Sequence, residues 1–191
     1  LFLEAARMMK LDNPNDVSFV LVSYLPVPSH LGEMKTKPTQ HAARTLNNSG
    51  IQPDFIIARG KDELDEPRRE KLAFFCWLNS KNDVISAPDM PSIYEIPDVL
   101  EKQHLGELLA KRLKIKLNRG YNKNWDNFVR KIKIADKTVK IAVVGKYFST
   151  GDFTLADSYI SVIEALKHAA WVNKVKPELT WLNAEDFNPT S

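Results

Sequence analysis

The chain has 191 residues, 43% of them hydrophobic and 27% charged, as expected of a soluble globular protein with one large domain or two small ones. The formal net charge of +3 is too small to indicate nucleic acid or an anionic membrane as the main partner. No apolar run approaches the roughly 20 residues that span a bilayer, and the only cysteine, Cys76, excludes an internal disulfide, so a reducing compartment, the cytoplasm, is expected.

The first predicted element is a helix at 1–9 that has no N-cap before it. The unbroken apolar, β-branched run at 17–27 is typical of a parallel strand that is buried on both faces. Strands and helices then alternate. Helices are predicted at 39–49, 66–78 and 104–115, strands at 53–59 and 84–87, and a helical pattern at 92–103 that Pro97 breaks or kinks. This order predicts an α/β fold with an open, mostly parallel sheet.

The character of the sequence changes after residue 115. The stretch 116–137 is polar and basic and is interpreted as a linker with one apolar helix face, made of Trp125, Phe128, Val129 and Ile132. A second α/β unit is predicted from a strand at 139–144, a turn at 145–147, a helix at 156–172 and a strand at 178–182. The expected parts are therefore 1–115, 116–137 and 138–191. A domain that ends on its second strand cannot cover both faces of its sheet, so the chain is expected to be a piece of a longer protein.

The most distinctive segment is Lys35-Thr36-Lys37-Pro38-Thr39-Gln40. Pro38 presets the first turn of the following helix, so free backbone N–H groups are expected to point outward at Thr39 and Gln40. Lysines beside a helix N-terminus suit a phosphate, and the Gln40 amide has the donor and acceptor that a pyrimidine edge requires. On residue types alone, two lysines that are merely solvated in a polar loop remain an alternative.

Several segments resemble CTP synthases, in the same order along the chain. Gly32 to His41 resembles the family's G-E-x-K-T-K-P-T-Q, and Gly50 to Asp54 its G-I-x-P-D. Further matches are Lys71-Leu72-Ala73-Phe74-Phe75-Cys76, Asp89 with Ser92-Ile93-Tyr94-Glu95-Ile96-Pro97, Val144-Gly145-Lys146-Tyr147 and Asp157 to His168. The first part would then be an incomplete, P-loop-like amidoligase domain, and the last part the start of a class I glutaminase domain.

The resemblance implies an ATP-dependent ligase that makes CTP from UTP with ammonia from glutamine. ATP phosphorylates the uracil 4-oxygen, and ammonia then displaces the phosphate. By the same resemblance, UTP and the inhibitory product CTP are bound by Lys35, Thr36, Lys37, Pro38, Thr39, Gln40 and Lys71. The expected assembly is a homotetramer with this site at a subunit interface, with Mg²⁺ as cofactor and GTP as activator.

The resemblance also places the ATP adenine near Pro88, Asp89 and Met90, with Arg59 beside the same nucleotide. Arg59 follows a strand carboxyl end, where ligands bind in open α/β sheets. Asp89 would accept a hydrogen bond from an exocyclic amine. A turn or helix N-terminal role for Asp89 stays open.

The family's phosphate-binding glycine loop, its Mg²⁺ carboxylates and its Cys-His-Glu triad are not found in this sequence, so no catalytic residue and no metal ligand are predicted. By itself the chain is expected to catalyse neither half-reaction. A non-catalytic CTP- or UTP-binding regulatory or filament-forming module is the main alternative, and another ATP-dependent amidoligase is a third. The segment 148–156 is longer than in the family, which bears on GTP activation.

No catalytic or metal-binding role is predicted for Cys76, for the four histidines or for Glu4. Cys76 lies in an apolar run rather than in a G-x-C-x-G turn, which predicts a buried structural thiol and not the glutaminase nucleophile. The four histidines lack metal-ligand spacing. Glu4 is expected to be a solvated helix carboxylate.

Overall fold

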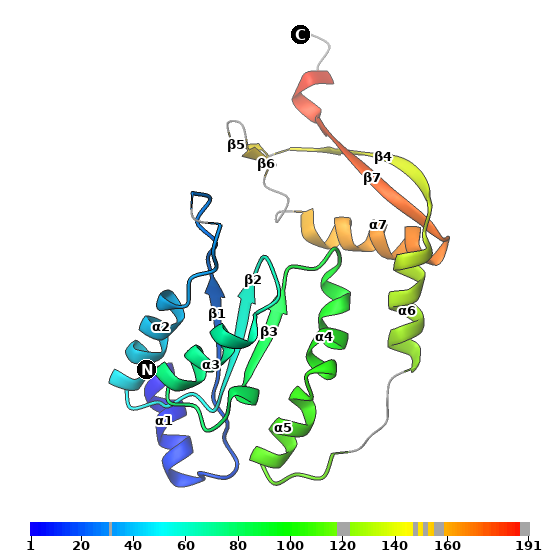
Figure 1. Ribbon diagram of the computed structural model, residues 1–191. Helices are drawn as coiled ribbons and strands as arrows, with labels where there is room; N and C mark the ends of the chain where they lie inside the picture. Colours follow the sequence, from blue (N-terminus) through cyan, green and yellow to red (C-terminus); the bar gives the residue numbers. More distant parts are fainter. Residues whose placement is uncertain (31, 118–122, 147–148, 151–152, 155–158, 188–191) are drawn as a thin grey trace. The chain divides into compact units, whose positions relative to one another are not determined.

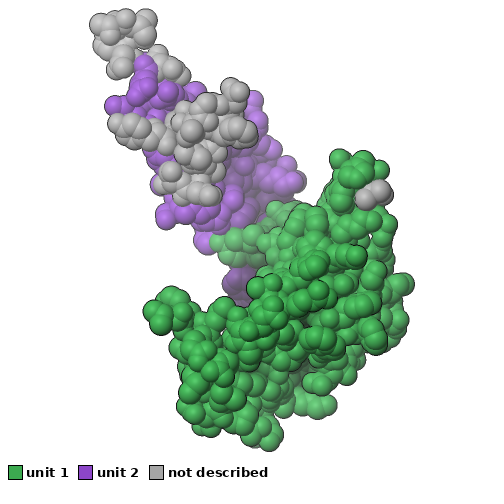
Figure 2. All heavy atoms as spheres, turned by 90° about the vertical axis from the view of Figure 1, so that its left-hand side faces the viewer, with its two compact units in different colours: residues 1–119 green, residues 120–191 purple. Residues whose placement is uncertain are grey.

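The computed structural model in Figure 1 describes the chain except for residues 31, 118–122, 147–148, 151–152, 155–158 and 188–191. The chain divides into two compact units, Leu1–Arg119 and Gly120–Ser191, which Figure 2 shows in different colours. None of the helices in the described ranges is both long and apolar enough for a bilayer crossing.

The first unit is built on a parallel three-stranded sheet of order β1-β2-β3. The strands are β1 (Val20–Leu25), β2 (Phe55–Gly60) and β3 (Val84–Pro88), with Val22 opposite Ile57 and Ile57 opposite Ile85. Strand β1 is shorter than the predicted 17–27 because Pro26, which has no N–H to donate, directly follows Leu25. The open parallel sheet confirms the predicted α/β fold class.

Five helices accompany this sheet (Figure 1): α1 (Phe2–Asp12), α2 (Lys37–Asn48), α3 (Glu66–Phe75), α4 (Ile96–Lys102) and α5 (Leu105–Arg112). The core on one face joins the strands to α2 and α3 through Leu25, Ala43, Ile56, Leu72, Cys76 and Val84. Helix α2 begins at Lys37, two residues before the prediction, since Thr36 is the N-cap and Pro38 fits the first turn. Pro97 does not break a helix at 92–103 in its middle: it lies in the first turn of α4, after a short 3₁₀ segment, Ile93–Glu95.

The Asp54 side chain connects α1, α5 and the segment just before β1 at the amino end of the sheet. Its carboxylate accepts hydrogen bonds from the Phe19 N–H at 2.7 Å, from Arg112 Nε of α5 at 2.7 Å and from Lys10 Nζ of α1 at 3.2 Å. The Asp54 side chain is only 13% exposed. Burial alone would raise its pKa, but these hydrogen bonds outweigh burial and leave the pKa below its ordinary value.

Gln103 completes the hydrogen bonding of the edge strand β3. Its Oε1 accepts from the Ser86 N–H at 2.8 Å, and its Nε2 donates to the Ser86 carbonyl at 2.7 Å and to the Val99 carbonyl at 3.0 Å. The side-chain amide thus does what a neighbouring strand would do at this position.

The second unit contains a parallel pair of strands, β4 (Lys137–Gly145) and β7 (Val175–Asn183). Its helices are α6 (Lys123–Ile134) and α7 (Ile160–Val172). A short hairpin is formed by β5 (Ser149–Thr150) and β6 (Phe153–Thr154). Helix α6 uses the apolar face predicted in the linker: Val129 is buried, and the Phe128 ring lies 5.5 Å from His168 and 5.8 Å from Trp171 of α7. Tyr147 of the predicted turn and the first residues of the predicted helix 156–172 lie outside the described residues.

Candidate functional site

The predicted nucleotide loop connects β1 to α2 at the carboxyl end of the sheet (Figure 1). The Lys35 N–H donates to the Pro26 carbonyl at 2.9 Å, which returns the loop to the end of β1. The Met34 methyl group lies over Gly60, where an added Cβ would come within 3.2 Å of it. Backbone and side chain together hold the loop against the ends of β1 and β2, where parallel α/β sheets bind ligands.

Charged side chains surround Lys35. Its Nζ lies 3.2 Å from Glu33 Oε2, and the other Glu33 oxygen lies 3.1 Å from Arg68 Nη2. Arg68 belongs to α3, donates through Nε to the Met34 carbonyl at 3.0 Å and also pairs with Asp65. Arg68 was not predicted from the sequence because 34 residues separate it from Met34, and no local pattern indicates such a contact.

The polar residues that follow Lys35 turn inward. Thr39 is fully buried and its hydroxyl lies 2.9 Å from that of Ser23 on β1, while buried Thr36 accepts a hydrogen bond from Gln40 Nε2 at 3.1 Å. These contacts of Thr36, Thr39 and Gln40 therefore support the start of α2. Lys37 and Pro38 are exposed, and so is Lys71 on α3. Since Lys71 lies one turn after Arg68, both side chains project from neighbouring positions on the helix.

A second cluster occupies the ends of β2 and β3. Arg59 Nη2 and Asp89 Oδ1 lie 2.8 Å apart, and the Asp89 N–H donates to the Gly60 carbonyl at 2.8 Å. Pro88 is the last residue of β3 and pairs with Gly60 in the sheet register. Met90 follows as a partly buried residue. The structure thus brings the four predicted ATP residues together, but it pairs Arg59 with Asp89.

A cavity of about 220 Å³ lies beside the nucleotide loop. It is lined by Val27, Gly32, Glu33, Met34, Asp62, Glu63, Asp65 and Arg68. In the part of the chain that the structure describes, no group of three or more His, Cys, Asp or Glu side chains is arranged to hold a metal ion. Four carboxylates, those of Glu33, Asp62, Glu63 and Asp65, line this cavity together with Arg68.

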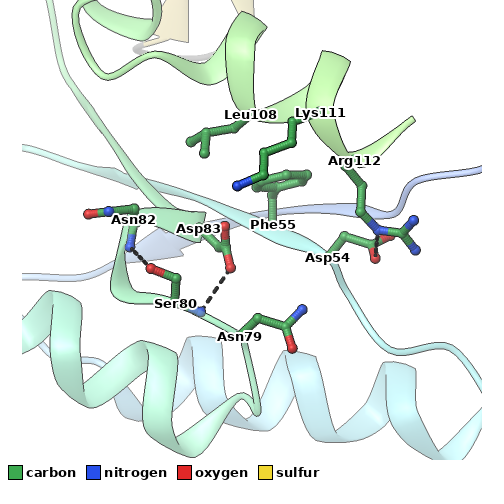
Figure 3. A pocket seen from close by; sticks show the side chains of 9 residues that line it. All are labelled: Asp54, Phe55, Asn79, Ser80, Asn82, Asp83, Leu108, Lys111 and Arg112. Carbon is green, nitrogen blue, oxygen red and sulfur yellow. Dashed lines mark hydrogen bonds and ion pairs between the residues drawn. The ribbon is translucent and has the colours of Figure 1, made fainter. Parts of the chain in front are cut away.

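A larger cavity, of about 420 Å³, lies at the opposite, amino end of the strands (Figure 3). It is lined by Asp54, Phe55, Asn79, Ser80, Asn82, Asp83, Leu108, Lys111 and Arg112. Burial raises the pKa of the Asp83 carboxyl, and the hydrogen bond from the Ser80 N–H at 2.9 Å offsets this only in part. None of the predicted site residues lines this cavity, and its place at the amino ends separates it from the candidate site.

Cys76 is fully buried in the core beneath α3. Burial raises the pKa of its thiol to about 11, so almost none of it is thiolate at neutral pH. This confirms the interpretation of Cys76 as a structural residue.

Comparison with known proteins identifies the family of this chain. The family model described as CTP synthase N-terminus matches residues 1–115. The CTP synthase of Pyrococcus furiosus is 47% identical over 186 residues, that of Pyrococcus abyssi 45% over 187, and that of Clostridium kluyveri 40% over 187. Each similarity covers 97% of this chain but only 34% of the relative, so the chain spans about a third of the length of these proteins. From the family match and these identities, the chain belongs to the CTP synthase family.

Proposed function

We propose that this chain is part of an enzyme that aminates UTP to CTP with ATP and glutamine-derived ammonia, and that its first unit carries the UTP and CTP loop and part of the ATP site. The observation that supports this most directly is the ion-pair bridge that runs from Lys35 of the loop through Glu33 to Arg68 of α3. Two cations held by one carboxylate, with the exposed Lys37 of α2 and Lys71 of α3 as further basic residues, suit a triphosphate, which binds through charge-assisted hydrogen bonds.

In this proposal the basic residues position the triphosphate and do not transfer protons. Exposed Lys37 and Lys71 are accessible to phosphate oxygens without rearrangement. Gln40 would leave Thr36 to present its amide to the pyrimidine. Arg59 and Asp89 would separate when the adenine of ATP enters, since each would exchange its partner for the nucleotide. The residues that bind Mg²⁺ and catalyse both half-reactions are proposed to lie elsewhere in the full-length protein.

We further propose that 1–115 is the later part of an amidoligase domain, that 116–137 is a linker and that 138–191 opens a glutaminase domain. Exposed apolar residues on β1 support a larger first domain: Val20, Val22 and Tyr24 are 37%, 59% and 55% exposed along one face. Apolar side chains at alternate positions of a parallel strand are normally covered by other polypeptide. The relatives are about three times as long as this chain, and we propose that part of their additional length covers this face.

Further parts of the proposal concern assembly and regulation. The nucleotide loop would serve a site at a subunit interface of a cytoplasmic homotetramer, CTP would inhibit, and GTP would activate glutamine use. A CTP-binding module without catalysis is the alternative that the same loop geometry allows, because loop geometry alone reports binding and not turnover.

The test is CTP formation by the full-length protein from UTP and Mg-ATP, with ammonium chloride in place of glutamine. Ammonia bypasses the glutaminase half and isolates the reaction of the amidoligase domain. Removing a charged phosphate contact costs about 1.5–3 kcal/mol, so Lys35→Ala and Lys71→Ala should each raise the KM for UTP about tenfold or more. Lys102 is an exposed lysine of α4, and Lys102→Ala is the matched control, which should leave the KM for UTP unchanged.

Absence of CTP formation by a folded wild-type protein that still binds CTP would contradict the enzyme proposal and support the non-catalytic module. Equal KM values for the Lys35, Lys71 and Lys102 variants would show that the loop does not bind UTP.

A further inference from the structure

Glu33 lies in the middle of the candidate phosphate site with a charge opposite to the one the site would need. Its two carboxylate oxygens contact two cations on different elements: Oε2 lies 3.2 Å from Lys35 Nζ and Oε1 lies 3.1 Å from Arg68 Nη2. A phosphate group would contact the same two cations in the same way, with one oxygen on each.

The three side chains differ in how firmly they are held. The Arg68 side chain is 26% exposed and is anchored at its other nitrogens by the Met34 carbonyl and by Asp65. Lys35 is 35% exposed and its backbone is fixed on Pro26. Glu33 is 56% exposed, and Lys35 and Arg68 are the ion-pair partners of its carboxylate among the described residues. Glu33 can therefore turn into solvent while the two cations stay in place.

The charge state of Glu33 follows from the same contacts. Hydrogen bonding to Lys35, reinforced by its positive charge and by Arg68, holds the pKa of Glu33 below its ordinary value. The carboxylate is thus ionised at neutral pH, and an incoming polyphosphate cannot share the two cations with it without charge repulsion.

We propose that the Glu33 carboxylate is an internal substitute for a ligand phosphate: it bridges Lys35 and Arg68 and is displaced when a nucleotide triphosphate binds between them. The inference rests on the proposed function, and it adds two residues to it. Arg68 becomes a phosphate ligand on α3, and Glu33 becomes a residue that weakens nucleotide affinity by competing for the same cations.

The Glu33 carboxylate also affects the two cations that it bridges. Without Glu33, the Lys35 ammonium and the Arg68 guanidinium would lose the carboxylate that bridges them, which is unfavourable for two like charges. The carboxylate keeps both cations oriented toward the site, so that binding exchanges one anion for another and does not require ordering of the loop.

Equilibrium binding of CTP, UTP and inorganic tripolyphosphate to the full-length protein tests this proposal. Glu33→Gln removes the competing charge and keeps the side-chain shape, so it should tighten binding of all three ligands about three- to tenfold. Glu63→Gln is the matched control, because it removes the same charge from the lining of the same cavity. Glu33, and not Glu63, is the ion-pair partner of Lys35 among the described residues, so Glu63→Gln should change the affinity by less than about twofold. Arg68→Gln should weaken binding about tenfold or more, and Arg68→Lys should restore part of it.

Unchanged or weaker binding by Glu33→Gln, or an equal gain in Glu63→Gln, would overturn the proposal. The binding data distinguish the proposed nucleotide function from the proposed role of Glu33. If the wild-type protein binds neither CTP nor UTP, but Glu33→Gln still tightens tripolyphosphate, the nucleotide function fails while the phosphate subsite stands. If the wild-type protein binds CTP and UTP and Glu33→Gln gains nothing, only the role of Glu33 fails.

Discussion

Arg59 and Asp89 form an ion pair of 2.8 Å although 30 residues separate them. The parallel register explains the contact: Arg59 lies opposite Ala87 at the end of β2, and Asp89 follows directly after β3. Both side chains are 52% exposed, and pairs of this exposure contribute about 0–1 kcal/mol to stability. A weak pair at the carboxyl edge can open for a ligand at little cost.

The first prediction follows from that pair. Asp89→Asn should change the free energy of unfolding by less than about 1 kcal/mol, yet raise the KM for Mg-ATP about tenfold, because the carboxylate is proposed to accept from the adenine amine. Steady-state kinetics of the full-length protein, together with thermal unfolding, measure both. A large loss of stability with an unchanged KM would assign Asp89 a structural role as a turn residue instead.

A second prediction concerns Asp54 as the link between α1, α5 and the start of β1. Asp54→Asn leaves Arg112 and Lys10 without their anion and should destabilise the protein by about 2–4 kcal/mol in urea unfolding at pH 7. Asp12 is an exposed carboxylate of α1, and Asp12→Asn is the control, which should lower the free energy of unfolding by less than about 0.5 kcal/mol.

The stabilisation by Asp54 should also depend on pH. Because its pKa is lower in the folded than in the unfolded protein, its contribution is complete above the unfolded-state pKa and is lost as the pH falls through the folded-state pKa. The stability difference between wild type and Asp54→Asn should therefore be largest near neutral pH and shrink below pH about 4. A difference that is constant from neutral to acid pH would contradict this assignment.

The third prediction concerns the edge of β3. Gln103→Met has similar length but cannot bond to Ser86 or Val99, so it should cost about 2–3 kcal/mol of stability through the unpaired backbone groups. Hydrogen exchange at the Ser86 amide should accelerate in this variant. If Ser86 exchanges at the wild-type rate, the side chain is not the partner that protects it.

The fourth prediction is that Cys76 is chemically inert in the folded protein. With a thiol pKa of about 11, only about one thousandth is thiolate at pH 8, and the sulfur is fully buried. A thiol reagent should label Cys76 only after denaturation. Cys76→Ala should cost about 1–2 kcal/mol through the cavity it leaves and should not affect ammonia-dependent turnover. Rapid labelling with loss of activity would show that the thiol is accessible and functional.

Local patterns predicted most of the fold. The apolar run at the start of β1, the alternation of strands and helices, and the apolar face of α6 depend on neighbours a few residues apart, which the sequence displays directly. Boundaries were less accurate where caps and prolines act. Thr36 caps α2 two residues earlier than predicted, and Pro97 starts a helix that it was expected to break.

The candidate site was predictable only in part. The loop from Lys35 to Gln40 is contiguous, so its composition and its resemblance to a family were available from the sequence alone. Which of its side chains are buried could not be predicted from the sequence. Thr36 and Thr39 are buried because the loop folds back onto β1, and that packing depends on Ser23 and Pro26.

By itself, then, the sequence determined the α/β order of elements and the presence of a basic loop before a helix, since both arise from residues close together in the chain. The tertiary structure decided which charges meet. Arg68 reaches Glu33, and Arg59 reaches Asp89, only because parallel strands bring distant segments to one edge of the sheet. Ion pairs act over a few ångströms of space, and distance along the chain does not indicate distance in space.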